Sequence, residues 1–412
     1  MLHQSIAKYK LYFCPIVYSF CKSDLQSVKL SDRGSGSQMR IAVNTRFLLK
    51  DRLEGIGWYT HEVLRRLVEQ HPEHDFIFFF DRPFAPEFIF GPNVEAVVLY
   101  PPARHYVLWW WWFEIAVPRA LRRHRADVFL SFDGYCSLQT EVPTLMVTHD
   151  IAHVHYPDQI PGWARHYYHR FVPRYLQRAD RIVTVSEFVR QDILRHYSPT
   201  AEKIIIAGNG CKSVFHPVPA ERQTIVREKY SNGKPYFFYL GALHPRKNIE
   251  RLIRAFGRFK QEQGGDIQLL IGGRLAWQSA AIKQTWERSE VRDDIHWLGY
   301  VPDSELPDLL GSALALTYVS LFEGFGVPLL EAMHAEVPVI TSNVSSMPEV
   351  AGDAALLVDP ESETAIAEAM RQIATDAKLR RRLIEAGKKQ RAQYSWDKTA
   401  DIIWRTLKDL QR

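Results

Sequence analysis

The stretch Glu323-Gly-Phe-Gly-Val-Pro-Leu-Leu-Glu331 is the most informative part of this chain. Two carboxylates eight positions apart flank a Gly-Phe-Gly turn. Pro328 suits the first turn of a helix, where no N–H donor is needed. The run follows an apolar, strand-like segment, Ala313–Val319. Because ligands of open α/β sheets bind just beyond the C-terminal ends of strands, the sequence predicts a ligand site in this loop.

The chemistry of the loop favours a polyhydroxylated ligand. Gly324 and Gly326 lack a Cβ, so the backbone there can approach a ligand closely. Glu323 would lie just before the helix and Glu331 inside it, and both carboxylates can accept hydrogen bonds from the hydroxyls of a sugar or a ribose. A helix start with two solvated glutamates is the alternative interpretation. The Gly-Phe-Gly-Val-Pro core between the carboxylates argues against it.

Strand-like runs alternate with helical patterns on both sides of this stretch, which is typical of parallel sheets covered on both faces. Ser186 stands where a helix N-cap is expected. The expected strands of the first half are Ile41–Asn44, Phe76–Phe80, Val94–Leu99, Val128–Ser131, Thr144–Thr148, Arg181–Val185 and Lys203–Ala207, with helices at Trp58–Glu69, Trp163–Gln177 and Glu187–His196. Those of the second half are Tyr236–Leu240, Ile267–Ile271, Ile295–Leu298, Ala313–Tyr318 and Val337–Thr341, with helices at Ile249–Gln261, Ala276–Arg288, Ser304–Leu310 and Pro328–Ala335 and a helical C-terminal stretch from Glu361.

A break in this alternation predicts the domain boundary. The segment His216-Pro-Val-Pro-Ala220 interrupts the pattern, so we expect two doubly wound α/β domains, residues 39–216 and 217–395, facing a cleft. Residues 1–38 differ in character: their apolar patch is shorter than the roughly 20 residues that span a bilayer, and a Ser/Gly-rich segment follows. We expect either a disordered leader there or an artefact of the assigned translation start.

The overall composition excludes several classes of protein. The 412 residues include 52 basic and 47 acidic side chains, a net charge of +5, which argues against a nucleic-acid binder. Hydrophobic residues make up 46%, as in ordinary soluble domains. The four cysteines are scattered without a CxxC motif, which favours a reduced cytoplasmic protein; they are Cys14, Cys21, Cys136 and Cys211.

A second motif, Leu240-Gly-Ala-Leu-His-Pro-Arg-Lys-Asn248, ends another expected strand and leads into a helix. Arg246 offers a fork for phosphate oxygens and Lys247 a compact charge. A helix N-terminus adds attraction for an anion. Two solvated surface cations are the alternative, but the strand–turn–helix placement after Gly241 favours a diphosphate site that needs no metal.

Other candidates lie at similar places after expected strands. Gly55 and Gly57 follow the first strand and either present backbone amides to a phosphate or an acceptor, or form an ordinary loop. Gly272 ends a strand and either approaches a nucleotide or simply turns. His149 ends the strand Thr144–Thr148, where an imidazole could polarise a sugar hydroxyl. His153 and His155 follow it, but the chain has no Asp-x-Asp motif, so we expect no metal site.

The run Trp109-Trp-Trp-Trp-Phe113 lies close to several arginines. Residues 101–125 hold five arginines and one glutamate, a net charge of 5 − 1 = +4. Aromatic and basic residues together suit a membrane interface, so peripheral membrane contact from Trp109 to Arg125 is one interpretation. The other is the packing of an aromatic helix into the core.

These motifs together resemble the retaining glycosyltransferases of family 4, which have the GT-B fold, and the resemblance runs from about Met39 to the C-terminus. Glu323 and Glu331 match that family's paired glutamates, and its basic pair and cleft histidine match Arg246, Lys247 and His149. Ala242 stands near a position where some members carry a further arginine. The resemblance implies that Glu323 and the backbone at residues 325–327 (Phe325, Gly326, Val327) contact the donor sugar. It also implies that Gly241 and Gly272 lie beside the donor and that Glu331 holds the ribose. Finally, it implies that a helix at residues 396–412 returns to the first domain.

The expected function is transfer of a hexose, with retention, from a nucleotide diphosphate sugar to a hydroxyl of a glycan or lipid-linked acceptor. His149, Arg246, Lys247 and Glu323 would serve the chemistry without a metal or other cofactor. The sequence around Lys247 is most similar to that of bacterial mannosyltransferases of surface polysaccharide assembly. This similarity implies that GDP-mannose is the donor. It also implies that the protein works in the cytoplasm or on the inner face of the cytoplasmic membrane. The alternatives are a UDP-sugar-dependent transferase, an epimerase or phosphorylase on the same fold, and a non-catalytic scaffold that binds sugar nucleotides.

Overall fold

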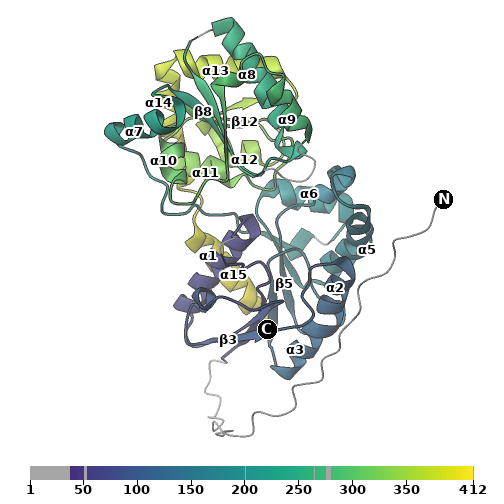
Figure 1. The fold of residues 1–412 in the computed structure, drawn as a ribbon. Helices are drawn as coiled ribbons and strands as arrows, with labels where there is room; N and C mark the ends of the chain where they lie inside the picture. The colour runs from purple at the N-terminus through teal and green to yellow at the C-terminus, as the bar shows by residue number, and fades with distance from the viewer. Residues whose placement is uncertain (1–37, 51–52, 200, 264, 275–279, 412) are drawn as a thin grey trace, which may run out of the picture. The chain divides into compact units, whose positions relative to one another are not determined.

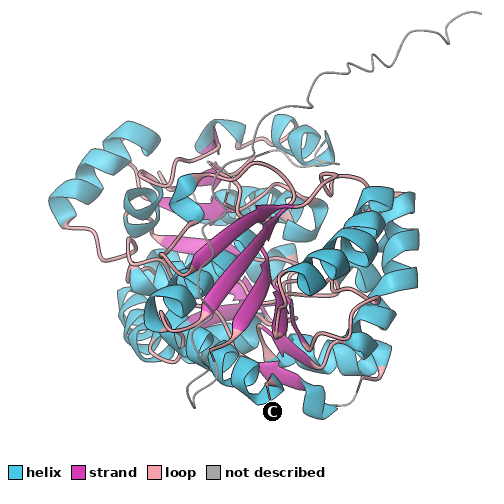
Figure 2. Ribbon diagram, turned by 90° about the horizontal axis from the view of Figure 1, so that it is seen from below, coloured by secondary structure: helices cyan, strands magenta, loops and turns pink. Residues whose placement is uncertain are grey.

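The computed structural model describes residues 38–50, 53–199, 201–263, 265–274 and 280–411. The expected leader, residues 1–38, lies outside the described residues except for Gln38. The described residues build two parallel sheets, each flanked by helices (Figures 1 and 2).

The first sheet has seven parallel strands in the order β3-β2-β1-β4-β5-β6-β7. Strands β4 and β5 are buried along their whole length, as expected when helices cover both faces. The strands are β1 Arg40–Asn44, β2 Asp75–Phe80, β3 Val94–Val98, β4 Val128–Ser131, β5 Thr144–Thr148, β6 Arg181–Thr184 and β7 Ile204–Ile206. The helices are α1 Gly55–Gln70, α2 Tyr106–Trp111, α3 Val117–Arg123, α4 Ala152–His155, α5 Gly162–Arg178 and α6 Glu187–Tyr197, with short 3-10 turns at Pro86–Phe88, Pro157–Gln159 and Ala201–Lys203 and a π-helical turn at Trp112–Ala116 between α2 and α3.

The second sheet has six parallel strands in the order β10-β9-β8-β11-β12-β13. The strands are β8 Tyr236–Leu240, β9 Gln268–Gly272, β10 Ile295–Gly299, β11 Ala315–Tyr318, β12 Val339–Ser342 and β13 Ala355–Val358. The helices are α7 Ala220–Ser231, α8 Ile249–Gln263, α9 Ala280–Glu287, α10 Leu306–Gly311, α11 Val327–His334, α12 Met347–Ala351, α13 Glu363–Thr375, α14 Ala377–Arg391 and α15 Trp396–Leu410, with 3-10 turns at Pro245–Lys247, Arg292–Asp294 and Gly352–Ala354.

Strand order reverses at one point in each sheet, and these points fix where ligands can bind. In the first sheet the chain builds outward from β1 and then returns to place β4 on its other side; β8 and β11 repeat this arrangement in the second. Loops that leave two such neighbouring strands diverge to opposite faces and leave a crevice between them. The residues that follow β1, β4, β8 and β11 are therefore the first places to look for a site.

The last helix connects the end of the chain to the first sheet. Helix α15 follows the helices of the second half yet lies beside α1 (Figure 1). Thr399 Oγ1 donates a hydrogen bond to the carbonyl of Ala207 at 3.0 Å, and the Trp404 ring stacks on that of His71 with centroids 3.6 Å apart. The return of the C-terminal helix to the first domain is thus confirmed.

The strands predicted to begin at Ala313 and Val337 begin later in the structure, because backbone hydrogen bonds to the ends of the preceding helices hold these residues. The amide of Ala313 bonds the carbonyl of Leu310 at the end of α10, so β11 starts at Ala315. The amide of Val337 bonds the carbonyl of Ala332, and Pro338 has no N–H, so β12 starts at Val339.

The prediction of a loop at Gly55 and Gly57 is wrong, because both residues are helical. Both glycines belong to the first turn of α1, where the amide of Trp58 already bonds the carbonyl of Glu54. A Cβ at Gly57 would come within 2.8 Å of the carbonyl oxygen of Phe47. Close packing of the helix start on the preceding loop therefore accounts for this glycine. The part of the predicted helix at residues 275–279 lies outside the described residues.

Candidate active site

Polar side chains end three neighbouring strands of the first sheet. Asn44 ends β1, Ser131 ends β4 and Thr148 ends β5. The Asn44 amide donates hydrogen bonds to Ser131 Oγ at 3.0 Å and to a carboxylate oxygen of Asp133 at 2.8 Å. Because parallel strands end at the same edge of a sheet, this network occupies the switch point predicted from strand order.

Arg46 is the buried cation of this network. Its Nε donates to Asp133, and its guanidinium lies 4.6 Å from the Tyr135 ring centroid and 5.9 Å from that of Trp109. Burial disfavours the charged form, but the charge and hydrogen bond of Asp133 together with the smaller effects of Tyr135 and Asp81 outweigh this, so the pKa of Arg46 lies above its ordinary value. The pair is neutral as a unit and holds the aromatic rings around it in place.

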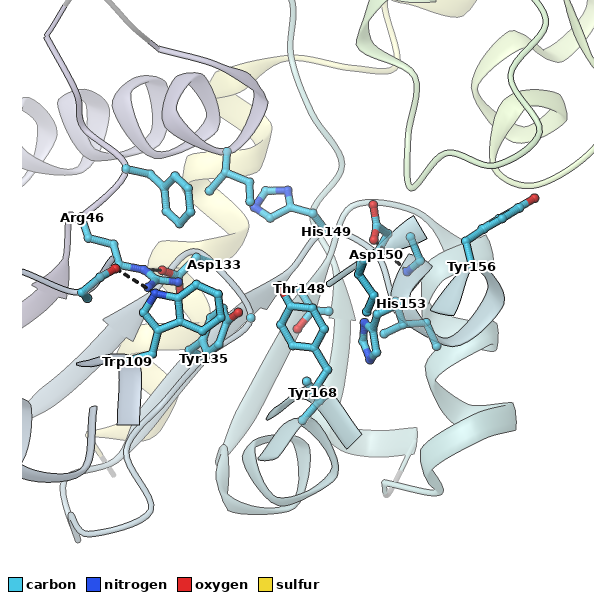
Figure 3. A pocket seen from close by; sticks show the side chains of 18 of the residues that line it. Arg46, Trp109, Asp133, Tyr135, Thr148, His149, Asp150, His153, Tyr156 and Tyr168 are labelled. Carbon is cyan, nitrogen blue, oxygen red and sulfur yellow. Dashed lines mark hydrogen bonds and ion pairs between the residues drawn. The ribbon is translucent and has the colours of Figure 1, made fainter. Parts of the chain in front are cut away.

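A cavity of about 580 Å³ opens over these residues. Figure 3 shows Arg46, Trp109, Asp133 and Tyr135 on one side of it and Asp150, His153 and Tyr156 on the other. Aromatic rings and a few polar atoms form its wall, which is the usual composition of a small-molecule site. We call it the aromatic cavity; among its lining residues are Arg46, Trp109, Tyr135, Thr148, Gln159 and Tyr168.

Three polar atoms in the lining residues of the aromatic cavity are buried without a hydrogen-bond partner among the described residues. They are Oγ1 of Thr148, Oε1 of Gln159 and Nε of Arg246. An unpaired buried polar group costs about 1–3 kcal/mol. Hydroxyl groups of a bound ligand would supply the missing partners.

His149 lines the same cavity, as predicted. Its Nε2 lies 2.8 Å from the carbonyl oxygen of Phe132. Because a carbonyl can only accept, Nε2 carries the proton and Nδ1 keeps its lone pair. Burial lowers the pKa of the imidazole below its ordinary value. His149 is therefore a neutral ring fixed in one tautomer, with Tyr59 packed edge-on at 4.9 Å.

The three histidines considered for a metal do not converge. His149 bonds Phe132, whereas Nε2 of His153 lies 2.8 Å from the hydroxyl of Tyr197. His155 instead contacts the carboxylate of Asp192.

The switch point of the second sheet carries the predicted basic pair. Arg246 and Lys247 form a 3-10 turn between β8 and α8. Lys247 Nζ contacts a carboxylate oxygen of Glu323 and lies 2.7 Å from the hydroxyl of Tyr318 at the end of β11. The Tyr318 hydroxyl is 2.9 Å from the same carboxylate oxygen. We call Arg246, Lys247 and Glu323 the charged cluster.

Glu323 is held ionised within the charged cluster. Its side chain is buried, which by itself would raise its pKa. The charges of Lys247 and Arg246 outweigh this burial, so the pKa of Glu323 lies below its ordinary value. The ionised carboxylate thus lies in direct contact with Lys247, in a site where the side chains of Glu323, Lys247 and Arg246 are all largely buried.

Ser346 holds the backbone of the loop after Glu323 in place. Ser346 Oγ donates to the carbonyls of Glu323 at 2.9 Å and Phe325 at 3.0 Å. Gly326 has φ +96°, a conformation that favours glycine, and it caps α11 without a side-chain bond. The amide of Val327 thus lies at a helix N-terminus directly after the turn, whereas Pro328 has no N–H and the amide of Leu329 bonds the carbonyl of Gly326.

Glu331 is buried on α11 and differs from Glu323 in having no side-chain hydrogen bond within the described residues. Burial raises its pKa to about 7, and Lys212 opposes that rise only in part. Near neutral pH this carboxyl group is therefore ready to accept or donate a hydrogen bond to an incoming ligand.

Gly241 and Gly272 lie at the ends of adjacent strands, where backbones come together. Gly241 donates its amide to the carbonyl of Gly272 at 3.0 Å. A Cβ at Gly273 would come within 1.8 Å of the Gly241 carbonyl oxygen, and one at Gly272 would press on Val301 at 3.1 Å. The glycines here let the backbones at the ends of the parallel strands β8 and β9 come close together beside the charged cluster.

Residues of the first sheet's loops contact the loop after Glu323 directly. A carboxylate oxygen of Asp150 is 3.5 Å from Arg246 Nη1. Ser186 Oγ donates to the carbonyl of Gly324 at 2.6 Å, and a Cβ at Gly324 would come within 2.0 Å of the His149 carbonyl oxygen. The predicted residues His149, Arg246, Lys247 and Glu323 are therefore brought to one place.

Several residues of this site were missed by the sequence analysis. Asp133 follows β4 and Thr148 ends β5, so a systematic survey of polar residues at strand ends would have found them. Arg46 likewise follows the end of β1, but its pairing with Asp133, 87 positions away, could not be read from the local sequence. Tyr318 belongs to a strand that is buried throughout, and that hid its polar hydroxyl.

The tryptophan run serves more than one environment. Trp109 lines the aromatic cavity, Trp112 and Phe113 are fully buried, and Trp110 is 42% exposed. Glu114 lies in the π-helical turn and accepts from the amide of Leu138 at 2.9 Å. Within the described ranges, every helix is too short or too polar to cross a membrane.

Comparison with known protein families identifies two domains. The model for "Glycosyltransferase Family 4" matches residues 53–212, and that for "Glycosyl transferases group 1" matches residues 221–390. The chain is 31% identical over 363 residues to O-antigen chain mannosyltransferase B of Escherichia coli, covering 85% of this chain and 94% of that protein. It is 29% identical to O-antigen chain mannosyltransferase RfbU of Salmonella typhimurium, covering 58% and 64%.

Solved structures confirm the predicted fold. Sucrose-phosphate synthase from Thermosynechococcus elongatus superposes with a TM-score of 0.74 at 19% identity, covering 90% of this chain and 99% of that one. The lipopolysaccharide glycosyltransferase WaaG gives 0.70 at 18% identity, covering 88% and 99%. Both likenesses concern the two-domain architecture alone.

Proposed function

Because this chain belongs to the GT-B glycosyltransferases that carry the family 4 and group 1 domains, we propose that it transfers a hexose, with retention, from a nucleotide diphosphate sugar to a hydroxyl of a glycan or lipid-linked acceptor. Mannose from GDP-mannose is the donor we put first, since the relatives from Escherichia coli and Salmonella typhimurium are O-antigen mannosyltransferases. The product would be a cell-surface polysaccharide.

The observation that carries this proposal is the charged cluster at the switch point of the second sheet. Two cations and an ionised carboxylate lie together at strand ends, facing Asp150 and His149 of the first sheet's loops. A diphosphate needs cations, a sugar needs hydrogen-bond acceptors, and the cluster offers both within a few ångströms.

In the reaction, the bond between the anomeric carbon and the diphosphate oxygen breaks while the acceptor oxygen bonds to the same carbon. The acceptor hydroxyl loses its proton to the departing diphosphate. Negative charge grows on the diphosphate, and Arg246, Lys247 and the amide at the start of α11 would stabilise it. Attack from the face that the diphosphate leaves retains the configuration.

The remaining donor contacts in this proposal are those that the family resemblance implies. Ionised Glu323 accepts hydrogen bonds from hydroxyls of the donor sugar, and the backbone at residues 325–327 borders the same sugar. Glu331, which has no side-chain partner in the described structure, accepts from the ribose. His149, neutral and with a lone pair on Nδ1, accepts a hydrogen bond from a sugar hydroxyl beside the reacting carbon. Gly241 and Gly272 give the nucleotide a flat backbone surface.

The acceptor would lie in the aromatic cavity. Sugar rings present C–H faces that pack on aromatic rings, and Trp109 and Tyr168 offer such rings. The buried oxygens of Thr148 and Gln159 would receive its hydroxyls. No metal or other cofactor is needed in this scheme, since cations of the protein neutralise the diphosphate.

The experiment that tests the function uses the purified chain with GDP-mannose, UDP-glucose or UDP-N-acetylglucosamine and a synthetic lipid-linked glycan. We expect an extended glycan in mass spectrometry with GDP-mannose, and a retained anomeric configuration by NMR. Turnover with a UDP-sugar alone would overturn the mannosyl assignment. Isomerised donor would indicate an epimerase, transfer to phosphate a phosphorylase, and binding without donor consumption a scaffold.

We also propose that the chain works in the cytoplasm and touches the inner face of its membrane through residues 109–125. Trp110 is exposed on α2, as are Arg122 and Arg123 at the end of α3. An arginine near an anionic surface contributes about 1 kcal/mol. R122Q/R123Q should lower sedimentation with phosphatidylglycerol vesicles roughly 10-fold or more, and R258Q, an exposed control on α8, should not. Equal sedimentation of both variants would exclude this surface.

A further inference from the structure

Asp192 is a buried carboxylate between two histidines, away from the proposed transfer chemistry. It is 3% exposed and lies on the inward face of α6 with Val189 and Ile193. Nε2 of His155, at the end of α4, is 2.8 Å and 3.0 Å from its two carboxylate oxygens. Nδ1 of His196, one turn further along α6, is 3.2 Å from Oδ1.

This carboxylate has an unusual balance of charge. An ionised group removed from water needs a compensating charge or several hydrogen bonds. Throughout the part of the chain that the structure describes, the Asp192 carboxylate forms ion pairs with His155 and His196 and with no lysine or arginine. Two imidazoles compensate a carboxylate only when protonated, whereas a metal ion bound to all three groups would do so with neutral rings.

The two separations between histidine nitrogen and Asp192 oxygen, 2.8 Å for His155 and 3.2 Å for His196, are close to those between ligands of such an ion. The ligand atoms of the three groups all lie within 4.8 Å of one another. Ligand atoms held at roughly 2.0–2.1 Å around a tetrahedral ion are about 3.3 Å apart. Asp192 and His196 are four positions apart on one helix, which places them on the same face.

We propose that His155, Asp192 and His196 bind a divalent transition-metal ion of the zinc type, with water completing the tetrahedron. Two imidazole nitrogens and one carboxylate oxygen favour zinc-like ions over Mg²⁺ or Ca²⁺, which prefer oxygen ligands. Binding requires the facing nitrogen of each ring to lose its proton to the far nitrogen. His196 then also gives up its 2.9 Å bond with the carbonyl of Asp192.

The ion would join α4 to α6 next to the loop that precedes Glu323. The His155 ring packs on that of Phe322 with centroids 4.8 Å apart, and Ser186 at the start of α6 holds the carbonyl of Gly324. The metal would therefore stiffen the wall of the first domain that contacts this loop. It takes no part in the transfer reaction, so this inference stands apart from the proposed function.

Metal binding by the tag-free, chelator-stripped chain tests the proposal. Calorimetric titration with Zn²⁺ should give one equivalent, and Co²⁺ should give the visible absorption of a tetrahedral site. H196N and D192N should each weaken Zn²⁺ binding at least about tenfold, since each removes a ligand. H216N removes an exposed histidine whose ring bonds only its neighbour's carbonyl in the structure, and it should bind Zn²⁺ like the unchanged chain.

Two results would overturn the proposal. One is failure of the unchanged chain to bind one equivalent of Zn²⁺. The other is unchanged affinity in H196N, whose exposed side chain can be replaced without disturbing the core. Circular dichroism and thermal midpoints in the absence of Zn²⁺ confirm that D192N remains folded before its affinity is compared.

Discussion

The charged cluster and the aromatic cavity occupy equivalent edges of the two sheets, yet they satisfy their polar groups in different ways. In the charged cluster, Lys247 and Glu323 are paired with each other before any ligand arrives. In the aromatic cavity, Arg46 and Asp133 are paired, but the oxygens of Thr148 and Gln159 have no partner among the residues that the structure describes. Lys247 and Glu323 must therefore exchange existing contacts to bind a ligand, whereas Thr148 and Gln159 only gain them.

This difference predicts how each region responds to mutation. Changes in the charged cluster should alter catalysis and stability together, since the same pairs serve both. Changes to the unpaired oxygens of the aromatic cavity should affect acceptor use while leaving the fold as stable as before. Four measurements can break or sharpen this contrast.

The largest effect should come from K247A. Loss of one preorganised donor to a developing negative charge costs about 10²–10³-fold in kcat. The buried Glu323 would keep the Tyr318 hydroxyl and the nearby charge of Arg246 but lose its ion-pair partner, which would also cost up to about 3–5 kcal/mol of stability. The double variant K247M/E323Q should recover the stability but not the activity, which separates the two roles. K283A, an exposed lysine on α9, is the matched control, and near-normal turnover of K247A would remove Lys247 from the mechanism.

Glu331 should make stability depend on pH. The unfolded chain ionises this group near 4.5 and the folded chain near 7, so the unfolded state releases a proton that the folded state keeps. The free energy of unfolding should therefore fall by about 3 kcal/mol between these pH values, and E331Q should lack this fall. Urea unfolding from pH 5 to 8 measures it. As a control, E385Q, which changes an exposed glutamate, should show the same pH dependence of stability as the unchanged chain. If E331Q also shows that same pH dependence, the pKa of Glu331 is not raised in the folded chain.

In the aromatic cavity, T148V tests the unpaired oxygen. The change keeps the shape of the side chain and removes a buried hydroxyl that has no partner in the described part of the chain. Acceptor KM should rise about 2–10-fold, the worth of one hydrogen bond, while donor KM and the thermal midpoint stay the same or the midpoint rises. T285V, on the exposed face of α9, serves as the control. A fall in stability without a change in acceptor KM would mean that the hydroxyl is structural.

The smallest effect should come from D150N, at the contact between the two regions. Asp150 holds Arg246 at 3.5 Å, and both side chains are partly exposed, so the pair contributes no more than about 1 kcal/mol. Asn keeps the acceptor that Asp150 offers to the amide of Ala152. Freed from this pair, Arg246 should bind the diphosphate up to about fivefold more tightly. Weaker donor binding in calorimetry would show instead that Asp150 positions Arg246.

Sequence reasoning reached the charged cluster because its parts are local. Arg246 and Lys247 follow β8 directly, and Glu323 and Glu331 flank one turn, so spacing alone exposes them. In the aromatic cavity only His149 and Arg246 were predicted as site residues, and the contact between Arg46 and Asp133 could not be, since these residues meet only through the pairing of β1 with β4. The tryptophan run divides between environments for a related reason: successive helical residues point about 100° apart, so Trp109 lines the aromatic cavity, Trp110 is exposed and Trp112 is buried.

The fold was predictable where apolar runs were bounded by turn residues, and strand order supplied the rest. Periodicity located most strands and helices to within a few residues, including Ser186, whose Oγ accepts from the amide of Val189 as an N-cap. It missed β13, whose residues are half exposed, and it gave no account of α7, whose apolar face is weak. Both depend on neighbours that the local pattern does not contain.

The contact between Gly324 and the carbonyl of His149 limits which residues position 324 can accept during evolution. A single added methyl group at residue 324 would come within 2.0 Å of that oxygen and force the two loops apart. Variation that retunes sugar preference can therefore accumulate around the loop but not at this position. The same constraint offers a practical tool: G324A is a one-atom wedge with which a separated state could be trapped and its structure determined.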